Sequence, residues 1–154
     1  MIKQLLCASL ALGSSVVLLL AADAFTGIWK LDIAKSTFAS ENPAPKALTL
    51  TFTEEGASRT QILEGIAADG TATSTSWTAP TTGGTVSFPA GQGPNGGASV
   101  KLVDERTLLM TQNLSNGRRG ASRTYQLSAD GKTLTLTRVR EDGKEMARLT
   151  FSRQ

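Results

Sequence analysis

The chain has 154 residues, with 16 lysines and arginines against 13 aspartates and glutamates, no histidine and a single cysteine, Cys7. The lack of histidine excludes a Ser-His-Asp triad, histidine-ligated zinc or iron, and acid–base catalysis by imidazole. Cys7 lies in a segment that we expect to be removed, so the mature protein is expected to contain no disulfide, thiolate nucleophile or thiolate metal ligand.

The N-terminal segment has the three parts of a secretory signal peptide. Lys3 provides the basic start, an apolar run of about 16 residues covers positions 5–20, and Ala22-Asp23-Ala24 has the small-residue pattern of a cleavage site. The run is shorter than the roughly 20 residues that span a bilayer, and no basic stop-transfer cluster follows it. We therefore expect residues 1–24 to form a cleavable signal helix. The mature protein of 130 residues (154 − 24) is then periplasmic or extracellular, without stable membrane insertion.

The mature chain opens with Phe25-x-Gly27-x-Trp29-Lys30-Leu31. This motif resembles the first strand of the calycin superfamily, which comprises lipocalins, fatty-acid-binding proteins and avidins. The longer segment that continues through Ser36 is similar to a group of small exported bacterial proteins. The resemblance implies a lipocalin-like β-barrel in which the tryptophan packs at the closed end under an arginine from a late strand. It therefore makes Gly27, Trp29 and Arg148 the barrel-closing residues, with Arg138 as the second candidate for that arginine. A guanidinium stacked on an indole is a favourable contact.

Residues 33–46 follow this first strand and include Pro43 and Pro45. The segment is too irregular for a strand, because proline removes a ladder donor. We interpret it as a short helical turn or a cap over one end of the sheet.

The rest of residues 25–154, a length typical of one domain, consists of short segments rich in Thr, Val, Leu and Ile that are separated by turn dipeptides. Asp-Gly and Asn-Gly are strong hairpin signals because tight turns need a positive φ. The turn dipeptides are Glu55-Gly56, Asp69-Gly70, Gly83-Gly84, Gly96-Gly97, Asp104-Glu105, Asn116-Gly117, Asp130-Gly131 and Asp142-Gly143. Their spacing predicts an all-β, antiparallel up-and-down meander of about 8–10 strands in a single barrel domain.

Alternation of side chains along two segments indicates strands with one buried face. Leu48, Leu50 and Phe52 alternate with threonines. In the last segment one face carries Ala147, Leu149 and Phe151, and the other carries Met146, Arg148 and Thr150.

Arginines lie on one face of two neighbouring predicted strands. Arg123 and Tyr125 share a face, and on the next strand Arg138 and Arg140 follow Leu134 and Leu136 on one face. If this face lines the interior, the arginines would hold a carboxylate or another anion. The alternative is that they lie outside, past a bulge, and keep an exposed sheet soluble.

The segment over residues 71–78 is almost entirely Thr, Ser and Ala apart from Trp77. Small inward side chains leave room for a ligand in a barrel of about eight strands. Trp77 either packs in the core beside Trp29 or lines the mouth of that space. The candidate ligand-binding residues are Trp77, Arg123, Tyr125, Arg138, Phe52 and Met110.

Two functions remain open on these observations. The first is an exported barrel that binds a small apolar or amphipathic ligand and performs no catalysis. Arg123 or Arg138 would contact an anionic end of that ligand. The second is a structural or interaction protein of the cell envelope whose barrel is filled by its own side chains. Enzyme activity is not expected, since any site would need an unusual carboxylate or lysine arrangement.

No metal or cofactor is expected either. The segment Gly91-Gln92-Gly93-Pro94-Asn95-Gly96 has the letters of a dinucleotide fingerprint, but the residues after it alternate like a strand, where that motif requires a helix. Nucleic acid is not expected as a partner, because the basic residues lack interleaved aromatic side chains. A monomer is favoured.

Overall fold

The computed structural model describes residues 24–41 and 43–154. The predicted signal peptide lies outside the described residues except for Ala24. Ten strands follow, with these bounds: β1 Gly27–Phe38, β2 Ala47–Glu55, β3 Ser58–Ile66, β4 Ala72–Pro80, β5 Gly84–Thr85, β6 Ala98–Asp104, β7 Thr107–Asn113, β8 Arg119–Leu127, β9 Thr133–Val139 and β10 Glu145–Arg153. The prediction of an all-β chain with about 8–10 strands is confirmed.

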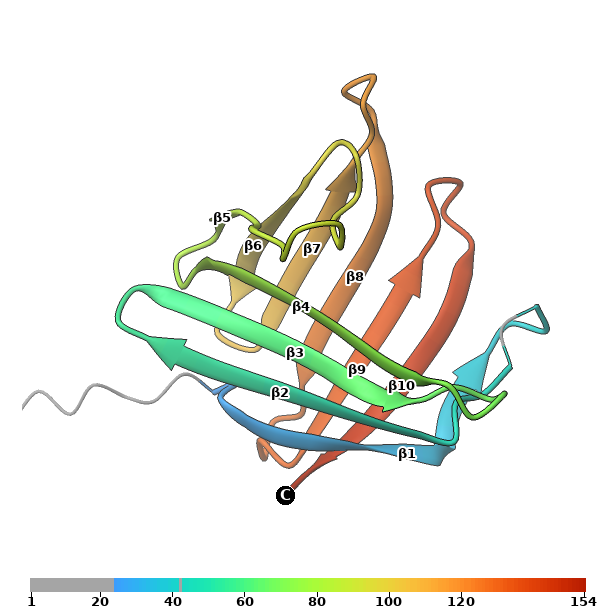
Figure 1. Ribbon diagram of the computed structural model, residues 1–154. Coiled ribbons are helices and arrows are strands. Elements are labelled where there is room, and N and C mark those ends of the chain that lie inside the picture. The colour runs from blue at the N-terminus through green and yellow to red at the C-terminus, as the bar shows by residue number, and fades with distance from the viewer. Residues whose placement is uncertain (1–23, 42) are drawn as a thin grey trace, which may run out of the picture.

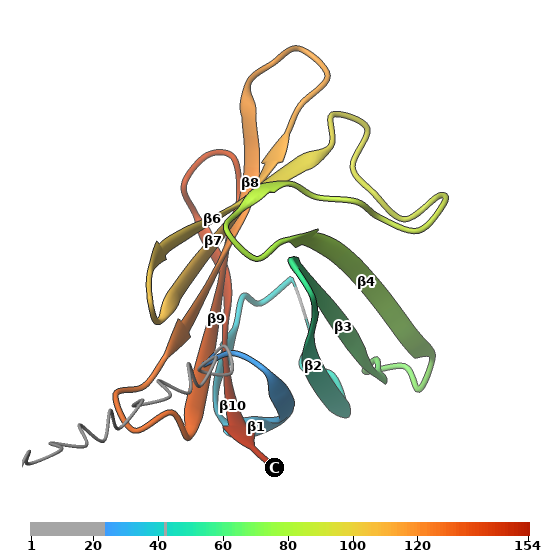
Figure 2. The same ribbon diagram turned by 90° about the vertical axis from the view of Figure 1, so that its left-hand side faces the viewer.

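The strands form one antiparallel up-and-down sheet in which consecutive strands pair except β4 and β5, which are its two edges, and β1 also pairs with β10. The order β4-β3-β2-β1-β10-β9-β8-β7-β6-β5 therefore places the first and last strands side by side at its centre. Figure 1 shows β2, β3 and β4 passing in front of β6–β10, and Figure 2 shows these two groups on opposite sides of the molecule. The sheet thus curls into a barrel.

The barrel is nearly closed where its two edges meet. Thr78 on β4 and Ser87 after β5 exchange two backbone hydrogen bonds of 2.9 and 2.8 Å. Because β5 has only two residues, contact between the edges is short. Residues 72–76 of β4 have no strand beside them other than β3 within the described part of the chain.

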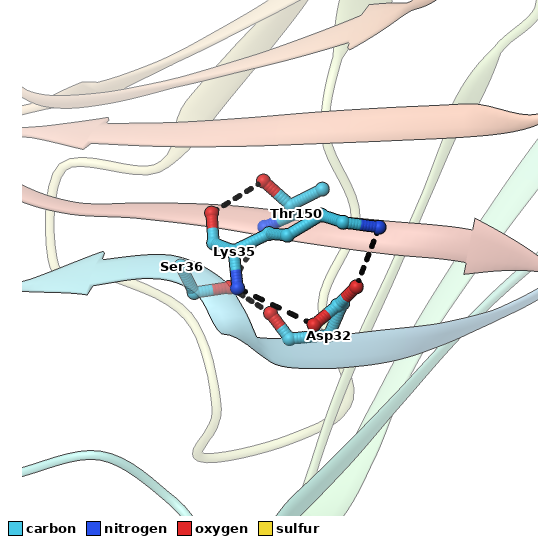
Figure 3. A network of polar contacts seen from close by, with 4 residues as sticks. All are labelled: Asp32, Lys35, Ser36 and Thr150. Atoms are coloured by element: carbon cyan, nitrogen blue, oxygen red, sulfur yellow. Dashed lines mark hydrogen bonds and ion pairs between the residues drawn. The ribbon is translucent and has the colours of Figure 1, made fainter.

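A large bulge interrupts the pairing of β1 with β10. Asp32 pairs with Thr150 and Thr37 pairs with Arg148, so five positions along β1 correspond to two along β10. Side chains satisfy the backbone there: Thr150 N–H donates to Ser36 Oγ (3.0 Å), and Ser36 Oγ donates to Asp32 O (2.7 Å). Thr150 Oγ1 donates to Lys35 O (3.0 Å), as Figure 3 shows. The expectation that residues 33–46 form no strand is therefore wrong for the first part, because these polar contacts carry β1 on to Phe38.

The closed end of the barrel is built around Trp29, which is fully buried. Its Nε1–H donates to the carbonyl of Phe25 (3.0 Å), and the guanidinium carbon of Arg153 lies 4.2 Å from its ring centroid. Arg153 also donates to the carbonyls of Ala24 (2.6 Å), Thr26 (2.8 Å) and Gly131 (2.9 Å). Arg153 at the end of β10 thus ties the residues just before β1 and the β8–β9 turn to one indole.

The late-strand arginine over Trp29 is therefore Arg153, and the assignment to Arg148 is wrong. Arg148 lies on the outer face of β10, where its side chain is 55 % exposed and pairs with Glu145 at 2.8 Å. The physical reason is strand alternation, since Ala147, Leu149 and Phe151 are buried and even-numbered residues point away from them. Arg138, the second candidate, lines the other end of the barrel.

Gly27 stands beside this stacked pair. Its φ of 140° is a conformation that residues with a Cβ rarely adopt. A Cβ built on Gly27 would lie 3.0 Å from Arg153 Nη1. Glycine at this position therefore leaves the space that the guanidinium uses to reach Trp29.

One contiguous core fills the barrel near this end. Its largest apolar members are Phe25, Trp29, Leu50, Phe52, Trp77, Leu108, Met110, Tyr125, Leu134, Leu136 and Phe151. In residues 24–41 and 43–154 we find no helix with the length and apolar character to cross a bilayer.

Candidate functional site

A cavity of about 510 Å³ occupies the end of the barrel away from Trp29. It is lined by Phe38, Pro43, Pro45, Leu48, Leu63, Ala67, Ala68, Asp69, Thr73, Thr75, Arg123, Tyr125, Leu136, Arg138, Met146, Ala147 and Leu149. Most of these side chains are apolar, as expected for a small-molecule site. The volume also lies within the range of about 300–1,000 Å³ typical of ligand pockets.

The position of the cavity follows from which inward side chains are large. Towards the closed end, Phe52, Trp77 and Tyr125 pack edge-on or tilted, with ring centroids 5.5–6.3 Å apart. Farther along the same strands, Leu48, Thr75 and Arg123 line the cavity in their place. The packed layer therefore forms the floor of the cavity.

Strand β4 leaves most of the room. Thr73 and Thr75 line the cavity and remain exposed, whereas Trp77 and Ala79 on the same face are buried. Threonine is too short to reach the opposite wall, and this strand has its free edge here. The sequence-based argument that a strand of small residues makes space in the barrel agrees with this arrangement.

Arg123 on β8 and Arg138 on β9 lie directly opposite each other in the strand register and both line the cavity. Each is half-buried. Burial lowers the pKa of Arg138 from its ordinary value, and the positive charge of Arg123 lowers it further. The interior interpretation is therefore correct for Arg123 and Arg138. It is wrong for Arg140, which lies in the β9–β10 turn, with its side chain 41 % exposed and paired with Glu41.

Neither arginine has an ion pair or hydrogen bond with another residue in the described part of the chain. Asp69 also lines the cavity, but its carboxylate accepts a hydrogen bond from Thr71 N–H (2.8 Å) and pairs with neither arginine. Half-buried guanidinium groups favour an anionic partner. The cavity therefore presents two uncompensated positive charges within an apolar wall.

Tyr125 joins the cavity to the packed core. It is 1 % exposed, it lines the floor, and its hydroxyl donates to Gln61 Oε1 (3.3 Å). Gln61 and Trp77, paired across β3 and β4, are each 2 % exposed. Within residues 24–41 and 43–154, Gln61 Nε2 and Trp77 Nε1 have no acceptor. Polar groups therefore continue below the floor of the cavity.

The structure brings three of the six candidate binding residues together at the cavity: Arg123, Tyr125 and Arg138. The other three, Trp77, Phe52 and Met110, point inward but belong to the packed core and do not line the cavity. Alternation predicts which face of a strand points inward. It does not predict how far along the barrel axis each residue lies, which is why these three were placed in the wrong layer.

Several lining residues were missed. Leu63, Leu136 and Leu149 continue the inward faces of their strands, and the same alternation could have found them. Phe38 could not have been found, because its place depends on the bulge in β1.

In the connection between β1 and β2, Pro43 and Pro45 line one side of the cavity. Glu41 on this connection pairs with Arg140 of the β9–β10 turn at 2.9 Å and lies 4.0 Å from Lys144. Ala39 N–H also donates to Met146 O (2.9 Å). The connection is therefore tied to the neighbouring β9–β10 turn and to the start of β10.

A cluster of three or more histidine, cysteine, aspartate or glutamate side chains that could hold a metal ion does not occur among the residues that the structure describes. The chemical features of the cavity are accordingly two guanidinium groups, one phenol, one carboxylate at the rim and an apolar wall.

No protein-family model matches the chain, and no curated protein matches it. Among solved structures it is similar to a de novo designed fluorescence-activating β-barrel, with 15 % identity over 87 % of this chain and 97 % of that one, at a TM-score of 0.45. A redesigned β-barrel is similar at 14 % identity over 87 % of this chain and 95 % of that one, at a TM-score of 0.46. No residue of the site is assigned from either protein.

Proposed function

We propose that the protein is an exported, calycin-like barrel that binds a small amphipathic molecule without catalysis. The apolar body of the ligand occupies the cavity, and its anionic end meets Arg123 and Arg138. The observation that carries the proposal is the pair of half-buried arginines without a partner in the described chain, inside an otherwise apolar cavity of about 510 Å³.

The same observation argues against a barrel filled by its own side chains. A filled barrel has no need of two like charges placed opposite each other on an inward face, since such pairs are destabilising. A ligand anion removes this penalty on binding. We propose binding without catalysis for two reasons. The chain has no histidine, and the lining of the cavity includes one carboxylate, that of Asp69 at the rim, so it offers no pair of carboxylates for acid–base catalysis.

Export and a monomeric state are part of the proposal. Export is supported by the signal pattern of residues 1–24, and a monomer by a barrel that nearly closes on itself. We propose neither a nucleic-acid partner nor membrane insertion of the mature protein.

Native mass spectrometry of the mature protein purified from its host, before and after delipidation, tests the function. We expect an added small molecule that delipidation removes. Binding of a panel of amphiphiles to the delipidated protein is then measured by calorimetry. Thr75→Phe should abolish binding by filling the cavity, whereas Ser74→Phe, on the outer face of the same strand, should leave it unchanged.

No co-purified molecule and no amphiphile binding would refute the proposal. Equal loss of binding in the Thr75→Phe and Ser74→Phe variants would place the ligand outside the cavity.

A further inference from the structure

We propose that the anionic end of the ligand is a tetrahedral dianion, the phosphate group of a phosphate monoester, held by Arg123 and Arg138 together. The inference rests on the proposed function and deepens it by naming the headgroup.

The register of β8 against β9 places the two arginine side chains next to each other. Arg123 and Arg138 are Cα partners on β8 and β9, and both side chains enter the cavity. Directly opposite residues have Cβ atoms about 4.5–5.5 Å apart. Two arginine side chains starting this close can reach one small group at the same time.

The charge at this position is unbalanced. In the described chain no carboxylate pairs with either arginine, and Asp69 is bound to Thr71 at the rim. A monoanion neutralises one of the two charges and leaves the other half-buried. A dianion neutralises both.

The number of acceptor oxygens points the same way. Each guanidinium presents a fork of N–H donors, and arginine binds carboxylate and phosphate in a bidentate manner. A carboxylate has two oxygens, so one fork already occupies it. A phosphate monoester has three terminal oxygens and carries about −1.5 to −2 charges at pH 7, which suits two forks.

The residues around Arg123 and Arg138 are mostly apolar, so the two arginines remain available to bind an anion. Tyr125 on β8 is the neighbouring polar group. The other neighbours that line the cavity are apolar: Leu136 on β9, Ala147 and Leu149 on β10, and Phe38 on β1. Asp69 is the charged group facing them from the β3–β4 turn. The apolar remainder of the wall matches an alkyl chain attached to the phosphate.

Calorimetry with four probes below their micelle concentrations tests the headgroup: dodecyl phosphate, dodecanoate, dodecanol and inorganic phosphate. At pH 7.5 we expect dodecyl phosphate to bind at least about tenfold more tightly than dodecanoate. The reason is that the phosphate can accept charge-assisted hydrogen bonds from both arginines, whereas the carboxylate is occupied by one. Dodecanol, with the chain but no charge, and inorganic phosphate, with the charge but no chain, should both bind more weakly than dodecyl phosphate.

The pH dependence gives a second signature. The second pKa of a phosphate ester is about 6, so the dianion becomes a monoanion between pH 7.5 and 5.5. Affinity for dodecyl phosphate should fall over this interval, and affinity for dodecanoate should not. The protein has no histidine to titrate there. Glu54, whose pKa is raised by burial, pairs with Arg59 and does not line the cavity.

Variants separate the roles of the two arginines. Arg123→Met and Arg138→Met should each weaken dodecyl phosphate binding by about tenfold or more while affecting dodecanol little. Arg118→Met, in the exposed β7–β8 turn, removes the same charge and should change nothing. Arg138→Lys keeps the charge without the fork and should restore only part of the affinity, and circular dichroism confirms folding of each variant.

The outcomes are distinct. If dodecanoate binds as tightly as dodecyl phosphate, or if the two probes share one pH profile, the headgroup inference is overturned and the proposed function stands. If inorganic phosphate binds as tightly as dodecyl phosphate, the site is for a free anion and the headgroup inference is likewise overturned. If no probe binds, the inference fails together with the proposed function.

Discussion

The two ends of this barrel use the same strands and differ in what the inward side chains do. At the closed end, Trp29 is fully buried, and Phe25, Leu50 and Phe52 pack close to it. At the open end the inward positions of the same strands carry Leu48, Thr75 and the two arginines around a cavity. The alternation of inward and outward side chains therefore builds the wall of the barrel, whereas the size of the inward side chains along each strand decides which end is packed.

The stability of the protein should accordingly reside at the closed end. Trp29→Ala is expected to reduce the free energy of unfolding by about 3–5 kcal/mol, because it removes a large buried aromatic side chain. Urea denaturation of residues 25–154 measures this. A loss below about 1 kcal/mol would mean that this end is not the structural core.

The same enlargement at two positions of β4 compares the ends directly. Ala79 is 3 % exposed in the core, so Ala79→Leu should cost about 1–3 kcal/mol through overpacking. Thr75 faces the cavity, so Thr75→Leu should stay within about 0.5 kcal/mol of the native protein. Equal destabilisation by both substitutions would indicate that the cavity end is packed in solution.

Two arginines of β10 test which one closes the barrel. Arg153→Met should cost about 1–2 kcal/mol, since it removes the contact over Trp29 and hydrogen bonds to three carbonyls. Arg148→Met should have little effect, because Arg148 is exposed on the outer face. Thermal melts followed by circular dichroism compare them, and a larger effect of Arg148→Met would contradict the assignment.

The smallest expected effect is at the open end, in the ligand-free protein. Arg138→Leu should stabilise the delipidated protein by about 0.2–1 kcal/mol, because it removes a like-charge pair across two strands. Chemical denaturation of delipidated samples measures the change. A clear loss of stability would show that Arg138 has a structural partner.

Much of the fold was predictable from turn residues. All eight turn dipeptides lie at or beside connections between consecutive strands, and seven of them contain a glycine with the positive φ that tight turns use. The bulge in β1 was not predictable. It depends on Ser36 and Thr150, which lie 114 positions apart in the chain and meet only after β1 pairs with β10.

The candidate site was predictable in part. Alternation correctly placed Arg123, Tyr125 and Arg138 on shared strand faces but left open whether these faces point inward, and it contained the information that Arg148 faces outward. The assignment of Trp77, Phe52 and Met110 to the site failed for a different reason. Their height along the barrel axis depends on how ten strands are staggered, and this stagger is a property of the closed sheet.

By itself, the sequence determined the antiparallel meander, the turns, the side chains that share a strand face and the absence of histidine chemistry, because these depend on local conformational preference and on residue type. Only the tertiary structure decided that Arg153 stacks on Trp29, that Arg123 and Arg138 stand opposite each other on an inward face, and that a cavity lies beside them. These features arise from register and stagger between strands. Register and stagger emerge when distant segments pair, and no short stretch of the chain contains them.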